Sequence, residues 1–180
     1  MAVQIGAKPD SGFDNPIGML FDCHRRIERF LQILCVVAER AHGRKLADGE
    51  KMAVEDALRY FRTGGRRHTA DEEESLFPRL RAAEGACGLE ELNGLESDHD
   101  QADEMHAAVD ALYTKWIATG GLDSDDPLEM ERLLSSTRRL KLLYEAHIKV
   151  EEGTVFPRAA ETLDKGTIAE IGREFAERRR

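Results

Sequence analysis

Two stretches of the chain repeat one pattern of side chains that can bind metal. The first reads HTADEEESLFPRL from His68, and the second reads HIKVEEGTVFPRA from His147. In each stretch a glutamate follows the histidine by four residues, at Glu72 and at Glu151. On an α-helix, residues at i and i+4 lie on one face about one turn apart. Each stretch therefore predicts a pair of ligands that point the same way.

Further histidines fall on inward faces of the helices that the hydrophobic pattern predicts. In four segments apolar residues recur every three or four positions, which is the spacing of one buried helix face. His24 and His99 lie on two of these faces, and the pairs at His68 and His147 lie on the other two. Buried imidazoles and carboxylates are costly without partners. We interpret them as ligands of a cation that compensates the carboxylate charges.

The kinds of ligand narrow the choice of metal. Four imidazoles and two or more carboxylates are too many for one tetrahedral zinc ion. Calcium prefers oxygen ligands alone. A mixed set shared between two ions fits iron or manganese best. We therefore predict two iron ions, with manganese or zinc as alternatives, and Glu72 and Glu151 can each bridge the pair.

Other polar residues near these positions extend the candidate set. Glu28 and Asp103 follow His24 and His99 by four residues, so either of them, or solvent, can complete the coordination. His106 lies two turns beyond His99, about 10 Å along the helix axis. That separation favours a polar role beside the centre over direct coordination.

The second glutamate of each stretch has a different expected direction. Glu73 and Glu152 lie about 100° around the helix from the candidate ligands, and we expect them to have a surface role or a supporting role beside the ligands. Phe77 and Phe156, each followed by proline, are expected to pack at the end of the bundle and bend it.

The elements that carry these residues predict an all-α fold. Long amphipathic segments joined by short loops, among them EGACG and TGGLDSDD, predict an antiparallel up-and-down four-helix bundle over residues 16–162. Residues 1–15 are predicted to form an irregular arm. Residues 163–180 are predicted to form a helical tail, with a short helix from about Thr167 to Glu177. Gly64 and Gly65 are expected to interrupt the second helix and to lower the wall beside the site.

The composition limits the classes of partner. The chain has 180 residues, of which 41% are hydrophobic and 34% charged, as in ordinary globular domains. Its formal net charge of −9 argues against nucleic acid and anionic membranes, because both bind basic surfaces. The short C-terminal RRR is expected to be a solvated end. No apolar run approaches the length of a membrane span.

The cysteines and the N-terminus bear on the compartment. Cys23, Cys35 and Cys87 show no CxxC spacing and predict free thiols in a reducing environment. The first fifteen residues lack the charged and apolar regions of a signal peptide. We expect a cytoplasmic protein.

The order of the candidate ligands resembles that of the hemerythrin-like, HHE cation-binding family, H…HxxxE…H…HxxxE. The resemblance covers roughly residues 16 to 162 and includes the extensions EEESLFPRL and EEGTVFPRA. It implies an oxo- or hydroxo-bridged non-haem di-iron centre with Glu72 and Glu151 as bridges. The ligands that it implies are His24, His68, Glu72, His99, His147 and Glu151.

The sequence departs from the oxygen-carrying members that this family contains. Those have HxxxH on the third helix, where Asp103 stands here, and HxxxxD on the fourth, where this chain has HxxxE. The loss of one imidazole argues against reversible oxygen carriage. It favours binding of, or reaction with, O2, peroxide or NO, or the sensing of iron or redox state.

Two alternatives stay open at this point. One is a di-iron enzyme that decomposes peroxide or oxidises iron; ferritin-like enzymes have paired ExxH motifs, and here Glu96 and His99 form one such motif with no second. The other is a structural or regulatory helical bundle without bound metal. The sequence identifies no protein partner.

Overall fold

The structure is a computed structural model that describes residues 10–84, 90–122 and 126–180. Those residues contain helices and no strand, so the predicted all-α class is confirmed. Parts of the predicted loops EGACG and TGGLDSDD lie outside the described residues, as do residues 1–9, and Glu84 at the start of EGACG is the last residue of α4. The α-helices are α1 (Pro16–Ala41), α2 (Asp48–Tyr60), α3 (Arg66–Asp71), α4 (Phe77–Glu84), α5 (Glu90–Thr119), α6 (Pro127–Val150), α7 (Phe156–Thr162) and α8 (Lys165–Glu177). The π-helical segments are η1 (Phe61–Gly65), η2 (Glu72–Leu76) and η3 (Glu151–Val155).

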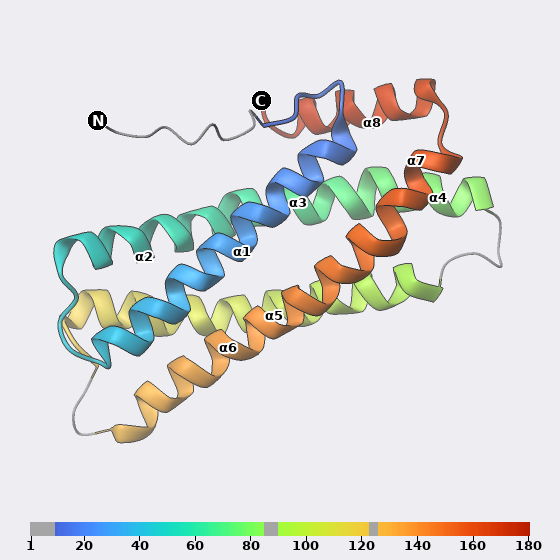
Figure 1. Cartoon of the computed structure of the whole chain (residues 1–180). Coiled ribbons are helices and arrows are strands. Elements are labelled where there is room, and N and C mark those ends of the chain that lie inside the picture. Colours follow the sequence, from blue (N-terminus) through green and yellow to red (C-terminus); the bar gives the residue numbers. More distant parts are fainter. Residues whose placement is uncertain (1–9, 85–89, 123–125) are drawn as a thin grey trace, which may run out of the picture.

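Two series of helices run on without a break and form long rods. One is α2, η1, α3, η2 and α4, and the other is α6, η3 and α7. Figure 1 shows both rods lying beside α1 and α5. Helix α1 packs against α6 and α2, and α5 packs against α6 and α2. Helix α8 lies across one end, where it contacts α1, α3 and η2.

Three helices begin with a side chain that caps the free backbone N–H groups of the first turn. Asn15 Oδ1 accepts from Gly18 N at 3.0 Å at the start of α1. Asp126 Oδ1 accepts from Leu128 N at 3.0 Å at the start of α6, and Asp164 Oδ1 accepts from Thr167 N at 2.8 Å at the start of α8. The caps fix where each helix begins, and therefore which of its residues face inward.

Both motif copies contain a π-helical turn that begins at the candidate ligand glutamate. The backbone N–H of Phe77 donates to the carbonyl of Glu72, and that of Phe156 donates to the carbonyl of Glu151. Such i to i−5 bonds define a π-turn. The proline that follows each phenylalanine has no N–H to offer an ordinary α-helical ladder. The helices nevertheless continue as α4 and α7.

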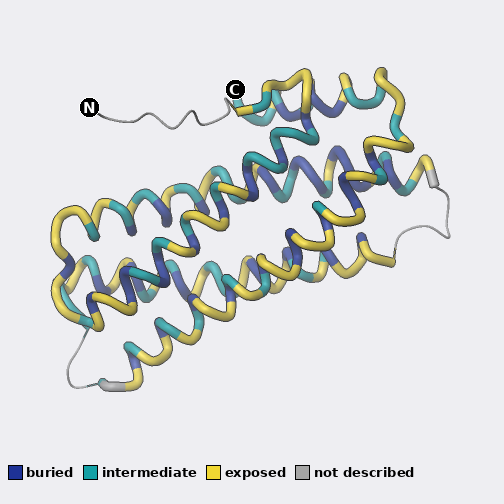
Figure 2. Tube along the Cα trace, viewed as in Figure 1, coloured by how far each residue is buried: buried dark blue, intermediate teal, exposed yellow. Residues whose placement is uncertain are grey.

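A layer of buried polar residues separates two apolar clusters. Along α1, Leu20 belongs to one cluster and Ile27 to the other, with His24 between them. Along α5, Leu95 and Ala102 flank His99 in the same way. Figure 2 shows that the buried positions continue along the inner sides of the rods. The polar layer is therefore enclosed by hydrophobic packing on both sides.

The C-terminus is not the solvated end that the RRR run predicts. Arg178 Nη1 donates to Asp71 Oδ1 at 3.0 Å, and Arg179 Nη2 donates to Asp71 Oδ2 at 2.6 Å. Asp71 is 0% exposed, so its carboxylate needs these partners. That prediction was wrong because the buried acid that pairs with the arginines lies far away in the sequence.

Two further observations bear on the expectations for cysteines and membranes. Cys23 and Cys35 are buried free thiols, and Cys87 lies outside the described residues. Among the described helices, none has the length and apolar character needed to cross a membrane.

Candidate metal centre

Six candidate ligands predicted from the sequence project into the polar layer from α1, from α5 and from the two rods. We refer to these four long elements together as the four rods. His24 comes from α1, His68 from α3 and His99 from α5, and His147 comes from α6. Each of the six side chains belongs to a residue that is exposed by 6% or less. Glu72 and Glu151 are the first residues of η2 and η3, one turn after His68 and His147.

The six side chains form two overlapping groups. One contains His24, His68, Glu72 and Glu151, and the other contains Glu72, His99, His147 and Glu151. Within each group, one potential ligand atom from every residue lies within 4.8 Å of the others. Both glutamates belong to both groups. The arrangement thus has room for two cations that share two carboxylates.

Glu72 turns its two oxygens toward different groups. Its Oε1 lies 3.4 Å from His68 Nε2 and 3.9 Å from His24 Nε2, while its Oε2 lies 3.5 Å from His99 Nε2. Glu151 Oε2 lies 3.0 Å from His24 Nε2 and 3.3 Å from His147 Nε2. A carboxylate placed in this way between two groups of imidazoles has the geometry of a bridge.

Six of the atoms that point into this layer have no hydrogen-bond partner among the described residues. They are both carboxylate oxygens of Glu72, both of Glu151, and Nε2 of His24 and of His147. Buried polar groups normally have a partner, and buried charges are normally paired or bound to metal. Carboxylate oxygens and imidazole nitrogens are also ligands that iron, manganese and zinc accept. The residues present therefore fit a metal site.

Burial favours the neutral forms of two of these side chains, Glu72 and His68. Burial raises the pKa of Glu72 well above its usual range, and the neighbouring Glu151 carboxylate raises that pKa further. Burial and the nearby His24 ring lower the pKa of His68 well below its usual range. A bound cation would reverse the preference of Glu72 and reinforce that of His68, because carboxylates and neutral imidazoles are the forms that act as ligands.

The second glutamates of the two motifs contact histidines of other helices. Glu73 Oε1 lies 2.8 Å from His99 Nδ1, and Glu152 Oε1 lies 3.0 Å from His24 Nδ1. Of the surface role or supporting role expected for these glutamates, the contacts fit the supporting one, although the Glu73 side chain is also 36% exposed. Each contact orients an imidazole so that its Nε2 faces the centre.

A third acidic contact has no counterpart in the sequence pattern. Asp98 Oδ2 lies 3.3 Å from His147 Nδ1. The sequence shows only that Asp98 directly precedes His99. That position does not distinguish an acid that contacts α6 from one that faces solvent. His68 differs, since its buried Nδ1 has no hydrogen-bond partner in the described part of the chain.

The phenylalanines of the motifs pack on the imidazoles of the other rods. Phe77 is stacked with His99 at 6.3 Å between ring centroids, and Phe156 is stacked with His24 at 5.3 Å. Both phenylalanines are buried. In each motif copy, the second glutamate and the phenylalanine thus both contact the same histidine of another helix.

Three further candidates lie outside the two groups. Glu28 is half-exposed and pairs with Arg25 at 3.1 Å. Asp103 is exposed. His106 Nε2 lies 3.0 Å from the hydroxyl of Tyr144, as expected for a polar residue beside the centre.

The chain is similar to known proteins over most of its length. The model of the hemerythrin HHE cation-binding domain matches residues 15–159. A Haemophilus influenzae protein described as uncharacterized is 27% identical over 169 residues, which cover 93% of this chain and 91% of that protein. The match to the family model spans most of the 180 residues. The chain belongs to the hemerythrin HHE cation-binding family.

Proposed function

We propose that the chain holds two iron ions between its four rods. The observation that carries the proposal is the set of buried, unpartnered carboxylate oxygens and imidazole nitrogens that face one another. His24 and His68 would hold one ion, and His99 and His147 the other. Glu72 and Glu151 would bridge the pair. Manganese or zinc could occupy the same ligands.

The proposal includes the topology. An antiparallel up-and-down four-helix bundle is supported by the packing of α1 against α2 and α6, and of α5 against α6. In such a bundle the four rods bring their ligands to one level, because neighbouring rods point in opposite directions.

The function that this centre supports best is binding of, or reaction with, small oxidants such as O2, peroxide or NO, or the sensing of iron or redox state. A pair of iron ions supplies one-electron redox chemistry at such a site. The protein contributes ligand positions fixed by Glu73, Glu152 and Asp98 and an environment that packed apolar clusters keep dry. The support for reaction rather than oxygen carriage is the missing imidazole at Asp103.

Metal analysis of the full chain, expressed with ample iron, tests the proposal directly. We expect about two irons per chain and an absorption band in the near-ultraviolet. Protein that folds but contains no iron would contradict the proposal, and so would His68→Leu and His147→Leu variants that retain their iron. Turnover of peroxide or of ferrous iron would show that the centre is enzymatic.

A further inference from the structure

A cavity of about 540 Å³ lies beside the metal centre, and none of the six candidate ligands lines it. It is bounded by η1 and α3 on one side and by α5 on the other, with Tyr144 of α6 at its inner end. Ligand pockets of proteins commonly have volumes of about 300–1,000 Å³. The cavity is therefore large enough for a small organic molecule.

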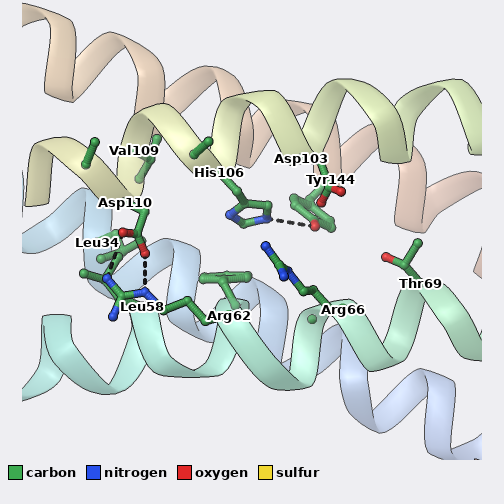
Figure 3. Close-up of a pocket in the computed structure, with 14 residues that line it drawn as sticks. Leu34, Leu58, Arg62, Arg66, Thr69, Asp103, His106, Val109, Asp110 and Tyr144 are labelled. Atoms are coloured by element: carbon green, nitrogen blue, oxygen red, sulfur yellow. Dashed lines mark hydrogen bonds and ion pairs between the residues drawn. The ribbon is translucent and has the colours of Figure 1, made fainter. Parts of the chain in front are cut away.

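One arginine side chain of this cavity has no partner among the described residues. Figure 3 shows Arg66 extending toward His106 and Tyr144, and no hydrogen bond or ion pair joins its guanidinium to another described residue. The other arginine of the lining, Arg62, is neutralised by Asp110, with its Nε 2.6 Å from Oδ2. The carboxylate of Asp103 also lines the cavity, but it forms no ion pair with Arg66.

Of the polar groups opposite Arg66, His106 and Tyr144 are neutral and Asp103 is an exposed carboxylate. Burial lowers the pKa of His106 to about 4, so its ring carries no charge at neutral pH. Its Nε2 is engaged with the hydroxyl of Tyr144 at 3.0 Å. Arg66 is therefore the arginine of this lining whose guanidinium has no ion-pair partner among the described residues, and an arginine guanidinium binds carboxylates through paired hydrogen bonds.

Part of the lining is apolar. Leu34, Leu58, Phe61 and Val109 are buried and face the cavity. The ring of Phe61 also packs against His106 at 4.5 Å between centroids. A ligand that fills this space must pair an anionic group with an apolar body.

An independent feature of the backbone marks the same place. The π-turns η2 and η3 correspond to each other in the two motif copies, whereas η1 has no counterpart, since α6 continues without a π-turn up to Glu151. Isolated π-turns occur frequently at functional sites. Phe61, Arg62 and Gly65 of η1 all line the cavity.

We infer that this cavity binds a small organic carboxylate, with its carboxylate on Arg66 and its apolar body against Phe61, Leu58 and Val109. The inference does not depend on metal in the neighbouring centre. Tyr144 separates the two sites, since its ring lies 6.3 Å from that of His147. A bound carboxylate would occupy the space next to the centre without joining its ligands.

Calorimetric titration of the full, metal-loaded chain tests the inference. The probes are benzoate and octanoate, with benzamide and octanamide as neutral counterparts of the same shape. We expect the carboxylates to bind at least tenfold more tightly than the amides. Arg66→Gln should weaken carboxylate binding about tenfold, and Arg66→Lys should retain part of it.

Arg67→Gln is the matched control, because Arg67 is exposed like Arg66 but does not line the cavity. Carboxylate affinity that is equal in wild type and Arg66→Gln would overturn the inference, as would equal affinity for benzoate and benzamide. No detectable binding by wild type would overturn it too. A change in the iron absorption that survives Arg66→Gln would show coordination to the metal instead, and would leave the proposed di-iron function standing.

Discussion

The two motif copies supply the same residues to the centre but differ in what surrounds them. In both, the histidine and first glutamate face inward, and the second glutamate and phenylalanine hold a histidine of another rod. The copy at His147 receives a further carboxylate from Asp98, whereas Nδ1 of His68 has no partner in the described residues. The shared part places the ligands, and the unshared part makes the two halves chemically distinct.

The residues that precede the bridging glutamates differ as well. Asp71 precedes Glu72 and is buried under the two C-terminal arginines, while Val150 precedes Glu151 and is 36% exposed. Only the first rod carries a π-turn before its motif, next to a cavity. The repeated pattern therefore accounts for the candidate ligands. The cavity beside η1 and the ion pairs of Asp71 belong to the first copy and have no equivalent in the described part of the second.

Removing either bridging glutamate should reduce the iron content more than any other change, and the reduction should be the same for both copies. Glu72→Ala and Glu151→Ala each take a ligand from both groups, so we expect less than one iron per chain in either variant. Elemental analysis against Glu104→Ala, which changes an exposed acid of α5, measures this. Retention of one full iron by either variant would show that the carboxylate is not shared.

The second glutamates should have smaller and matched effects. Glu73→Gln and Glu152→Gln remove the charge that orients His99 and His24, and loss of such a partner typically weakens metal binding by about 10–100-fold. Competition with a chelator measures both affinities. If one variant binds iron as tightly as wild type while the other does not, the two glutamates do not have equivalent roles.

The C-terminal anchor should affect stability in the first copy alone. Arg179→Gln leaves the buried Asp71 carboxylate with fewer charged partners, and we expect a loss of about 1–2 kcal/mol in unfolding free energy. Urea unfolding of the metal-loaded chain measures it, with Arg180→Gln at the exposed last residue as control. Equal stability of the two variants would mean that Arg178 alone satisfies Asp71.

The inward faces of the rods could be predicted from the sequence because they depend on local spacing. His68 with Glu72, and His147 with Glu151, share a face whatever the rest of the fold does. The all-α class follows from the same periodicity. That the six residues bind metal stays a prediction that their geometry supports.

Contacts between rods could not be predicted in the same way. Whether Glu73 meets solvent or His99 depends on how the neighbouring helix is rotated, which no local spacing contains. The pairing of Asp71 with Arg178 and Arg179 depends on where α8 lies, and the acid and its partners are far apart in the chain. The residue type alone does not tell whether such an acid pairs with another side chain or faces solvent.

Gly65→Leu should have the smallest effect of these changes, a slower reaction with azide. The equivalent change in the other copy should not slow that reaction. A side chain at Gly65 starts in ordinary contact with Phe61, 3.5 Å from Cδ1, and extends into the cavity beside Tyr144. Leucine also favours the helix over glycine by about 1 kcal/mol, so the variant should fold. We expect azide to react several-fold more slowly with the iron centre, because the filled cavity hinders approach from this side.

Gly153→Leu provides the matched comparison in the other copy. Gly153 lies in η3, and a Cβ there meets nothing within 4 Å, so its leucine should extend away from the protein and leave the azide rate unchanged. Stopped-flow absorbance measures both rates. Slowing in both variants would place the obstacle in the π-turns themselves, and slowing in neither would mean that azide enters by a path other than the cavity. Slowing in Gly65→Leu alone would assign access to the rod that carries η1.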